Sequence, residues 1–130
     1  MVQFPHKYGS MQGFMLLSEI KKLLDAGYLT ENVDPGLDIK GACGSDMLGN
    51  VMTAVRKGTV VLSGLANVQT VRAAELAEAS AIIFVWGKCP DRNILKMAED
   101  AGIAVLGTDR SMFEACGILY AAGLRGVDGK

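Results

Sequence analysis

Three short apolar runs, evenly spaced along the chain, constrain its fold more than any other feature. They cover residues 59–63, 81–85 and 103–107, so their starts lie about 22 residues apart, the length of a compact strand–helix unit. Continuous apolar strands are expected where a parallel sheet is covered on both faces, whereas a half-exposed sheet alternates. The runs therefore predict an α/β fold, with a compact, mostly parallel sheet flanked by helices and built from repeated strand–helix units.

The segments that follow these runs have helical spacing and clear start signals. The predicted helices cover 68–79, 91–101 and 111–122, and their start signals are Asn67, Pro90 and Asp109-Arg110-Ser111. In the last helix one stripe carries Met112, Phe113, Cys116, Leu119 and Tyr120. We expect this stripe to be apolar packing surface, with Cys116 a small core residue.

The first half of the chain is less regular. The first predicted helix has an apolar stripe, and Ser18 can cap its start and Gly27 can end it. The second has a similar stripe and ends at Gly58. The two stripes consist of Leu16, Leu17, Ile20, Leu23 and Leu24, and of Met47, Leu48, Val51, Ala54 and Val55. Between them, Tyr28–Val33 and Leu37–Cys43 are predicted to be extended, with a turn at Asp34-Pro35-Gly36. We therefore expect an irregular N-terminal arm (1–14), one α/β domain (15–124) and a flexible C-terminal tail (125–130).

Composition excludes several classes of partner. The 13 basic and 14 acidic residues give a net charge of −1, which offers no electrostatic reason to bind nucleic acid or an anionic membrane. No apolar run is long enough to span a bilayer, and no secretion signal is seen. The three cysteines, Cys43, Cys89 and Cys116, are far apart, which suits a reducing cytoplasm better than a disulfide framework.

Residue types that carry catalysis are missing from the predicted domain. The single histidine, His6, lies in the irregular arm, so no histidine triad or histidine-rich metal site can form within the fold. Gly87-Lys88 resembles the end of a phosphate-binding loop, but Cys89 stands where Ser or Thr is needed and Ile82 where the leading glycine belongs. We therefore expect no enzyme activity, no cofactor and no metal.

The loops after the strands are the candidate ligand site. In a doubly wound parallel sheet, ligands bind beyond the carboxyl ends of the strands, at helix N-termini. The candidate ligand-binding residues in these loops are Ser45, Asp46, Asn67, Lys88, Thr108 and Asp109. We expect Ser45 or Asp46 to cap the helix that follows. The alternative is that Asn67 and Ser111 only cap helices and that Lys88 and Arg110 are merely solvated.

Several segments resemble the DRTGG domain family over about Met15 to Leu124. They are Leu37–Val51, Leu62-Ser-Gly-Leu, Val71-Arg-Ala-Ala-Glu75, Ile83-Phe-Val-Trp-Gly-Lys88 and Ser111-Met-Phe-Glu-Ala-Cys-Gly-Ile-Leu-Tyr120. The signature itself is only partly kept: Asp38-Ile39-Lys40-Gly41-Ala42 retains the aspartate and a basic residue but not the full string. A role tied to that signature is therefore not carried over to this chain.

The resemblance implies a regulatory module. Similar domains accompany CBS modules in regulated pyrophosphatases, precede the catalytic part of some phosphotransacetylases, and resemble the non-catalytic N-terminal domain of HPr kinase/phosphorylase. Stand-alone copies resembling this chain occur beside iron-only hydrogenase genes. We therefore expect a non-enzymatic regulatory or adaptor domain that binds a nucleotide, another phosphorylated metabolite or a hydrogenase-related protein.

Two other functions and an assembly state remain open. The chain could instead be an accessory redox or metal-handling protein that uses Cys43 or Cys89. The third alternative is a small enzyme with an unusual arrangement of catalytic residues. A homodimer is also expected, because related domains associate and because Met47, Met52 and Trp86 exceed what so small a core needs.

Overall fold

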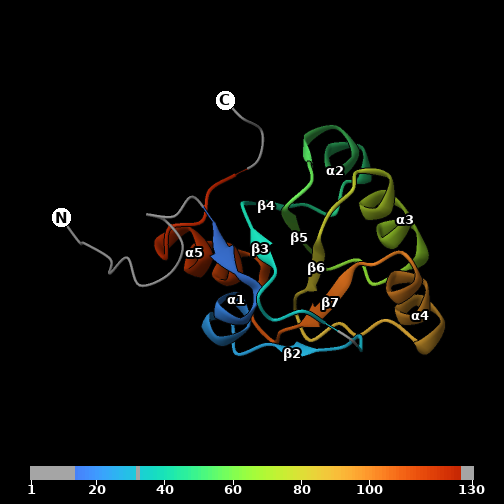
Figure 1. The fold of residues 1–130 in the computed structure, drawn as a ribbon, viewed down its shortest axis with the longest axis horizontal. Helices are drawn as coiled ribbons and strands as arrows, with labels where there is room; N and C mark the ends of the chain where they lie inside the picture. The colour runs from blue at the N-terminus through green and yellow to red at the C-terminus, as the bar shows by residue number, and fades with distance from the viewer. Residues whose placement is uncertain (1–13, 32, 127–130) are drawn as a thin grey trace.

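A five-stranded, mostly parallel sheet forms the centre of the domain (Figure 1). The computed structural model describes residues 14–31 and 33–126. The strands lie in the order β2-β7-β6-β5-β4. Their bounds are β2 Gly27–Tyr28, β4 Gly41–Gly44, β5 Thr59–Ser63, β6 Ala81–Phe84 and β7 Ala104–Gly107. Strands β4 to β7 are parallel, and β2 alone runs antiparallel, beside β7. The predicted α/β class is confirmed.

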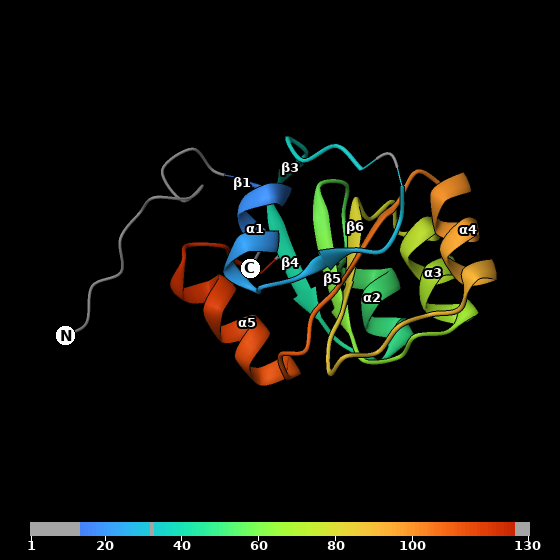
Figure 2. The same ribbon diagram turned by 90° about the horizontal axis from the view of Figure 1, so that it is seen from below.

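Helices cover both faces of this sheet, which gives three layers (Figures 1 and 2). On one face lie α1 (Leu17–Leu23) and α5 (Met112–Ala121). On the other lie α2 (Leu48–Ala54), α3 (Val68–Leu76) and α4 (Arg92–Asp100). A separate two-stranded antiparallel ribbon joins β1 (Met15–Leu16) to β3 (Asp38–Ile39).

Burial on both faces explains the continuous apolar runs. In β5, Val60 and Leu62 pack into the core under α1 and α5, while Val61 packs into the core under α2, α3 and α4. All five residues of β5 and all four of β6 are buried. A strand with two dry faces is therefore apolar on both sides of its central part, as at Val60, Val61 and Leu62, because successive side chains point to opposite sides.

The first helix differs from its prediction at both ends. It begins at Leu17, so Leu16 belongs to β1 and Ser18 lies inside the helix instead of capping it. It ends at Leu23, and the chain turns at Asp25, whose φ is +51°. Gly27, expected to end the helix, instead pairs with Gly107 as part of β2. These boundaries are set by strand pairing, of Leu16 with β3 and of Gly27 with β7. The spacing of apolar residues along the sequence does not reveal which strands pair.

The extended segments are shorter than predicted, and one of them is divided. Of the first, Tyr28–Val33, only Tyr28 lies in a strand, at the end of β2. The second, Leu37–Cys43, splits into β3 and β4, which belong to different sheets. The turn between them is confirmed, since the Asp34 carboxylate accepts a hydrogen bond from Gly36 N at 2.9 Å and its carbonyl accepts one from Leu37 N at 3.1 Å.

Helix α2 also departs from expectation. It runs from Leu48 to Ala54, stops short of Gly58, and has Met47 at its N-cap position without a side-chain cap. Neither Ser45 nor Asp46 caps it, because the Asp46 carboxylate is engaged by the loop after β5. The other caps agree better with the sequence: Asn67 and Ser111 cap α3 and α5 as predicted. Helix α4 is capped by Asp91, and Pro90 lies one residue before it.

The stripe predicted for the last helix is only partly buried. Ala115 and Leu119 are buried against the sheet, whereas Phe113 and Tyr120 project away from it, with 87% and 61% of their surface exposed. Cys116, expected in the core, is half-buried. Both aromatic residues were therefore placed on the wrong side of α5, because a helix that is apolar nearly all round gives no clear sign of which stripe faces inward.

The first two residues of the expected tail are held against the sheet. Ala42 N donates to Arg125 O at 2.9 Å, and Gly126 forms a bridge with Ala42 of β4. The expected arm lies outside the described residues except for Phe14, as does the tail from residue 127. None of the helices in the described part of the chain is long and apolar enough to cross a membrane.

Candidate functional site

Four loops meet at the carboxyl edge of the sheet. Because β4, β5, β6 and β7 are parallel and in register, the loops that follow them emerge at the same edge. They carry Ser45 and Asp46 after β4, Gly64 after β5, Trp86-Gly87-Lys88 after β6, and Thr108-Asp109-Arg110 after β7. The candidate residues therefore lie on one side of the molecule.

Asp46 ties the first two loops together. Its carboxylate accepts hydrogen bonds from the Ser63 hydroxyl at 2.9 Å and from Gly64 N at 2.7 Å. Ser45 acts locally, since its hydroxyl accepts from Met47 N at 3.0 Å. Both side chains therefore fix the shape of the loops, and the charge of Asp46 is directed at a backbone amide.

The loops after β6 and β7 are joined through their backbones. Trp86 N donates to Arg110 O at 2.8 Å, and Gly87 N donates to Thr108 O at 2.9 Å. Both donors lie in the left-handed region, with φ of +62° at Trp86 and +67° at Gly87. A tryptophan in this conformation is uncommon, and its indole is 62% exposed beside the loop after β5. The strained backbone thus presents a flat aromatic surface at the sheet edge.

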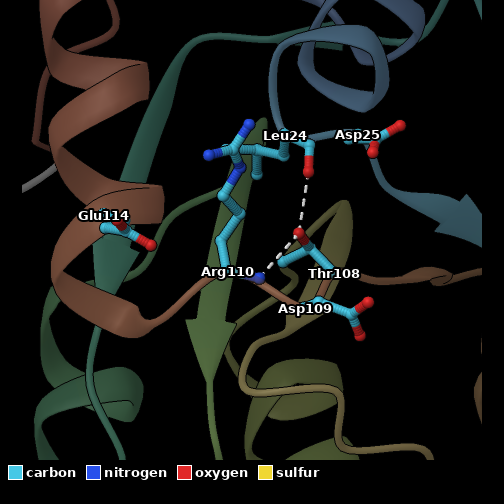
Figure 3. A pocket seen from close by; sticks show the side chains of 6 residues that line it. All are labelled: Leu24, Asp25, Thr108, Asp109, Arg110 and Glu114. Carbon is cyan, nitrogen blue, oxygen red and sulfur yellow. Dashed lines mark hydrogen bonds between the residues drawn. The ribbon is translucent and has the colours of Figure 1, made fainter.

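A cavity of about 300 Å³ opens at the same edge, between α1 and the start of α5 (Figure 3). It is lined by Leu24, Asp25, Thr108, Asp109, Arg110 and Glu114. The buried Thr108 hydroxyl (3% exposed) donates to Leu24 O at 2.8 Å and accepts from Arg110 N at 3.2 Å. Figure 3 shows Glu114 on the α5 side and Asp25 on the opposite side. One guanidinium and three carboxylates give this lining a net negative charge.

The predicted residues divide into two groups. Asn67 is a helix cap that accepts from Thr70 N at 3.1 Å, and Ser45, Asp46 and Thr108 hold the loops in place. Lys88 and Asp109 are exposed, and their side chains form no hydrogen bond to any other described residue. Within the candidate set, only these two side chains remain available to a ligand.

Sequence reasoning left four contributors out of the predicted set. Trp86 was noted only as surplus apolar surface, and its left-handed φ has no signature in the sequence. Asp25 and Glu114 reach the cavity because α1 and α5 pack beside each other on one face of the sheet. Arg110 was noted among the loop cations but not selected, although it directly follows Asp109.

Two of the three cysteines, Cys43 and Cys116, are half-buried thiols that form no disulfide. Burial raises the pKa of the Cys43 thiol. The pKa of the Cys116 thiol is raised mainly by burial and, to a smaller extent, by the neighbouring Cys43. Both residues are therefore held as neutral thiols at neutral pH, the less nucleophilic form. Among residues 14–31 and 33–126, no cluster of three or more His, Cys, Asp or Glu side chains is arranged to hold a metal ion.

Comparison with known proteins gives a likeness in fold. No family model matches the chain, and no curated protein matches it. Among solved structures it is similar to the CBS and DRTGG domains of the regulatory region of Clostridium perfringens pyrophosphatase, crystallised with its activator diadenosine tetraphosphate. The TM-score is 0.70 at 18% identity, and the match covers 92% of this chain but 51% of that one, so this chain spans about half of its length. The chain thus has a fold found in that regulatory region, consistent with a DRTGG-type domain.

Proposed function

We propose that this chain is a regulatory module without catalytic activity, which binds a nucleotide at the carboxyl edge of its sheet. The fold is similar to a regulatory region that was crystallised with a dinucleoside polyphosphate, and this likeness supports a regulatory role. The observation that carries the proposal is Trp86, an exposed indole held at φ +62° in the loop that also carries Lys88 and that is bonded through its backbone to the loop of Asp109 and Arg110. Sparsely populated backbone conformations cluster at ligand sites, where the surrounding structure maintains them.

The side chains at this edge match the parts of a nucleotide. The indole of Trp86 offers a stacking surface for a base, which is worth about 1–3 kcal/mol by alanine substitution in comparable sites. Asp109 offers a carboxylate to ribose hydroxyls, and Lys88 and Arg110 offer charge-assisted hydrogen bonds to phosphate oxygens. The proposal therefore assigns a role to Trp86 and Lys88 in the loop after β6 and to Asp109 and Arg110 in the loop after β7.

Contacts beyond the phosphate group favour a nucleotide over inorganic phosphate. The cavity between α1 and α5 has three carboxylates and one guanidinium, so any phosphate group meets net repulsion there and binding must rely on further contacts. A nucleotide adds base stacking and hydroxyl donors to its phosphates, so it gains contacts that inorganic phosphate lacks. We therefore expect micromolar affinity at best once association costs are subtracted.

Isothermal titration calorimetry with ATP, adenosine and inorganic phosphate tests this proposal. We expect ATP to bind, inorganic phosphate to show no measurable binding, and ATP to raise the melting temperature of the chain. Lys88→Ala and Trp86→Ala should each weaken ATP binding about tenfold, which corresponds to the loss of one charge-assisted hydrogen bond or one stacked base. The matched control is Lys57→Ala, an exposed lysine that precedes β5 at the opposite edge of the sheet.

Three results would contradict the proposal. One is the absence of ATP binding, and another is unchanged affinity in both Lys88→Ala and Trp86→Ala. The third is ATP turnover that survives repurification and is abolished by a point mutation, which would refute the non-catalytic role. The hydrogenase-related partner implied by the family resemblance stays a prediction.

A further inference from the structure

A small open space lies in front of Gly64, in the loop after β5. A Cβ at Gly64 would have three nearest neighbours, which are Asp46 Oδ2 at 3.5 Å and Trp86 Cδ1 and Val85 Cγ2, each at 3.8 Å. These are ordinary contact distances, and the φ of Gly64 lies outside the left-handed region, so neither crowding nor the backbone requires a glycine there. The missing side chain leaves this space open beside the exposed indole.

The hydrogen bonds that commit Asp46 to the loops use only one of its two carboxylate oxygens. Oδ1 accepts both from the Ser63 hydroxyl at 2.9 Å and from Gly64 N at 2.7 Å. Oδ2 accepts from no other described residue, and it is the oxygen that borders the space in front of Gly64. Rotation of the carboxylate would break both bonds to Oδ1, so Oδ2 is held in place before a ligand binds.

We infer that this space receives the hydrogen-bonding edge of a base stacked on Trp86, and that Asp46 Oδ2 selects guanine. The inference rests on the proposed nucleotide site and names the base that this site prefers. An ionised carboxylate only accepts hydrogen bonds. The other two atoms that border the space, Trp86 Cδ1 and Val85 Cγ2, are carbon. The space therefore fits a planar group whose edge presents donors and no acceptor.

Guanine is the base whose edge meets this requirement. Its N1–H and N2–H₂ groups are adjacent donors on the Watson–Crick edge, so either can reach Oδ2 without bringing an acceptor close to the carboxylate. Adenine and cytosine each place a ring nitrogen that accepts beside their amino group, and uracil places its N3–H between two carbonyl oxygens. A site with a fixed acceptor discriminates against bases that bring a lone pair to it, because the carboxylate then loses its partner and meets repulsion.

Isothermal titration calorimetry of the full chain with GTP and ATP tests the inference. We expect GTP to bind at least tenfold more tightly than ATP, the ratio that one charge-assisted hydrogen bond gives. Equal affinities for GTP and ATP would overturn the guanine assignment and leave the nucleotide site intact. Failure of both nucleotides to bind would instead contradict the proposed function, and the inference with it.

Asp46→Asn should change the base preference without loosening the loops. The amide oxygen can still accept from Ser63 and from Gly64 N, which puts the NH₂ group in the place of Oδ2. GTP should then bind at least tenfold more weakly relative to xanthosine triphosphate, which has a carbonyl oxygen where guanine has its amino group. The lost negative charge affects both triphosphates alike, so the ratio of their affinities is the measurement. An unchanged ratio would show that Asp46 does not contact the base.

The matched control is Asp38→Asn, which alters an exposed carboxylate in β3 and should keep the ratio of the parent chain. Circular dichroism checks that each variant is folded. A control that changes the ratio as much as Asp46→Asn does would also overturn the assignment.

Gly64→Ala tests whether the space itself is used. Its methyl group would lie at contact distance from Asp46 Oδ2 and Trp86 Cδ1, so the chain should fold while the base edge loses its room. We expect the affinity for GTP to fall at least tenfold, the loss of the hydrogen bond to Oδ2. Gly49→Ala adds a methyl group to α2 that meets nothing within 4 Å, and it should bind GTP like the parent chain. Unchanged GTP affinity in Gly64→Ala overturns the inference.

Discussion

The carboxylate of Asp46 accepts a hydrogen bond from the backbone amide of Gly64 at 2.7 Å, across two adjacent parallel strands. The same oxygen accepts from the Ser63 hydroxyl at 2.9 Å. This aspartate therefore links the loop after β4 to the loop after β5, and the exposed Trp86 lies beside that link. The geometry of the candidate site therefore depends on Asp46, whose carboxylate is already used in hydrogen bonds to Ser63 and Gly64.

Replacing Asp46 should loosen this edge of the sheet. We expect Asp46→Ala to lower the free energy of unfolding by about 1–2 kcal/mol, because it leaves a backbone amide and a hydroxyl without their charged acceptor. Urea denaturation measures the change. Asp109→Ala is the control, since the Asp109 carboxylate accepts no hydrogen bond from another described residue, and equal destabilisation by the two variants would contradict this role for Asp46.

The buried Thr108 hydroxyl should be a structural requirement of the cavity. It donates to Leu24 O at 2.8 Å and accepts from Arg110 N at 3.2 Å, so Thr108→Val leaves both backbone groups without a partner. We expect a loss of about 1–3 kcal/mol in the free energy of unfolding. Thr53→Val removes an exposed hydroxyl from α2 and should cost much less. A Thr108→Val variant as stable as the parent would show that these bonds contribute little.

Gly44 is required by its contact with α5. A Cβ at this position would lie 2.7 Å from Cys116 Sγ and 3.3 Å from Met112 Sδ, so Gly44→Ala should destabilise the chain by about 1–3 kcal/mol. Cys116→Ala removes the closer atom and should recover much of that loss in the double variant. Gly49→Ala is the matched control, because its Cβ meets nothing within 4 Å and it should stabilise α2 by up to about 1 kcal/mol. Non-additivity in thermal denaturation checks the contact, and a purely additive double variant would argue against it.

Stability should decline at alkaline pH through Cys43 and Cys116. Burial raises the pKa of both thiols above the ordinary value of 9.0, so the unfolded chain loses these protons at a lower pH than the native chain. Above the ordinary cysteine pKa the native state therefore binds more protons, and the free energy of unfolding falls as pH rises towards the raised values. Below about pH 8 the contribution is fully present.

Urea denaturation under reducing conditions at pH 7 and at about pH 9.5 measures this effect, with the upper pH set below the titration of tyrosine. The double variant Cys43→Ala, Cys116→Ala should lose less stability between the two pH values than the parent. An unchanged pH dependence in the double variant would show that these thiols do not control it. Burial also raises the pKa of Tyr28, with Asp34 as a second cause, so higher pH would mix the two contributions.

Trp86→Gly separates stability from binding at the sheet edge. The substitution removes the unfavourable left-handed tryptophan at φ +62° and exposes little new apolar surface, because the indole is already mostly exposed. We expect the free energy of unfolding to be unchanged or higher by up to about 1 kcal/mol. ATP binding should be lost at the same time. A strongly destabilised Trp86→Gly variant would instead show that the tryptophan has a packing role.

The sequence by itself determined the class of the fold and the edge that carries the candidate site. Residues 59–63, 81–85 and 103–107 are apolar at almost every position, a pattern typical of strands in a sheet buried on both faces. Asn67 and Ser111 were identified as helix caps because capping is a local interaction between residues three positions apart. The parallel order then followed from the regular spacing of strand–helix units.

Contacts between distant parts of the chain decided the rest. Asp46 was expected to cap α2 but turns to Gly64, because a neighbouring parallel strand presents a free amide that the local sequence does not reveal. Asp25 reaches Thr108 and Asp109 only because α1 packs beside α5. The side of α5 that carries Phe113 is likewise set by packing, since nearly the whole helix is apolar. Local patterns therefore defined the elements, and long-range packing defined which of their side chains face the core, the neighbouring loops or the surface.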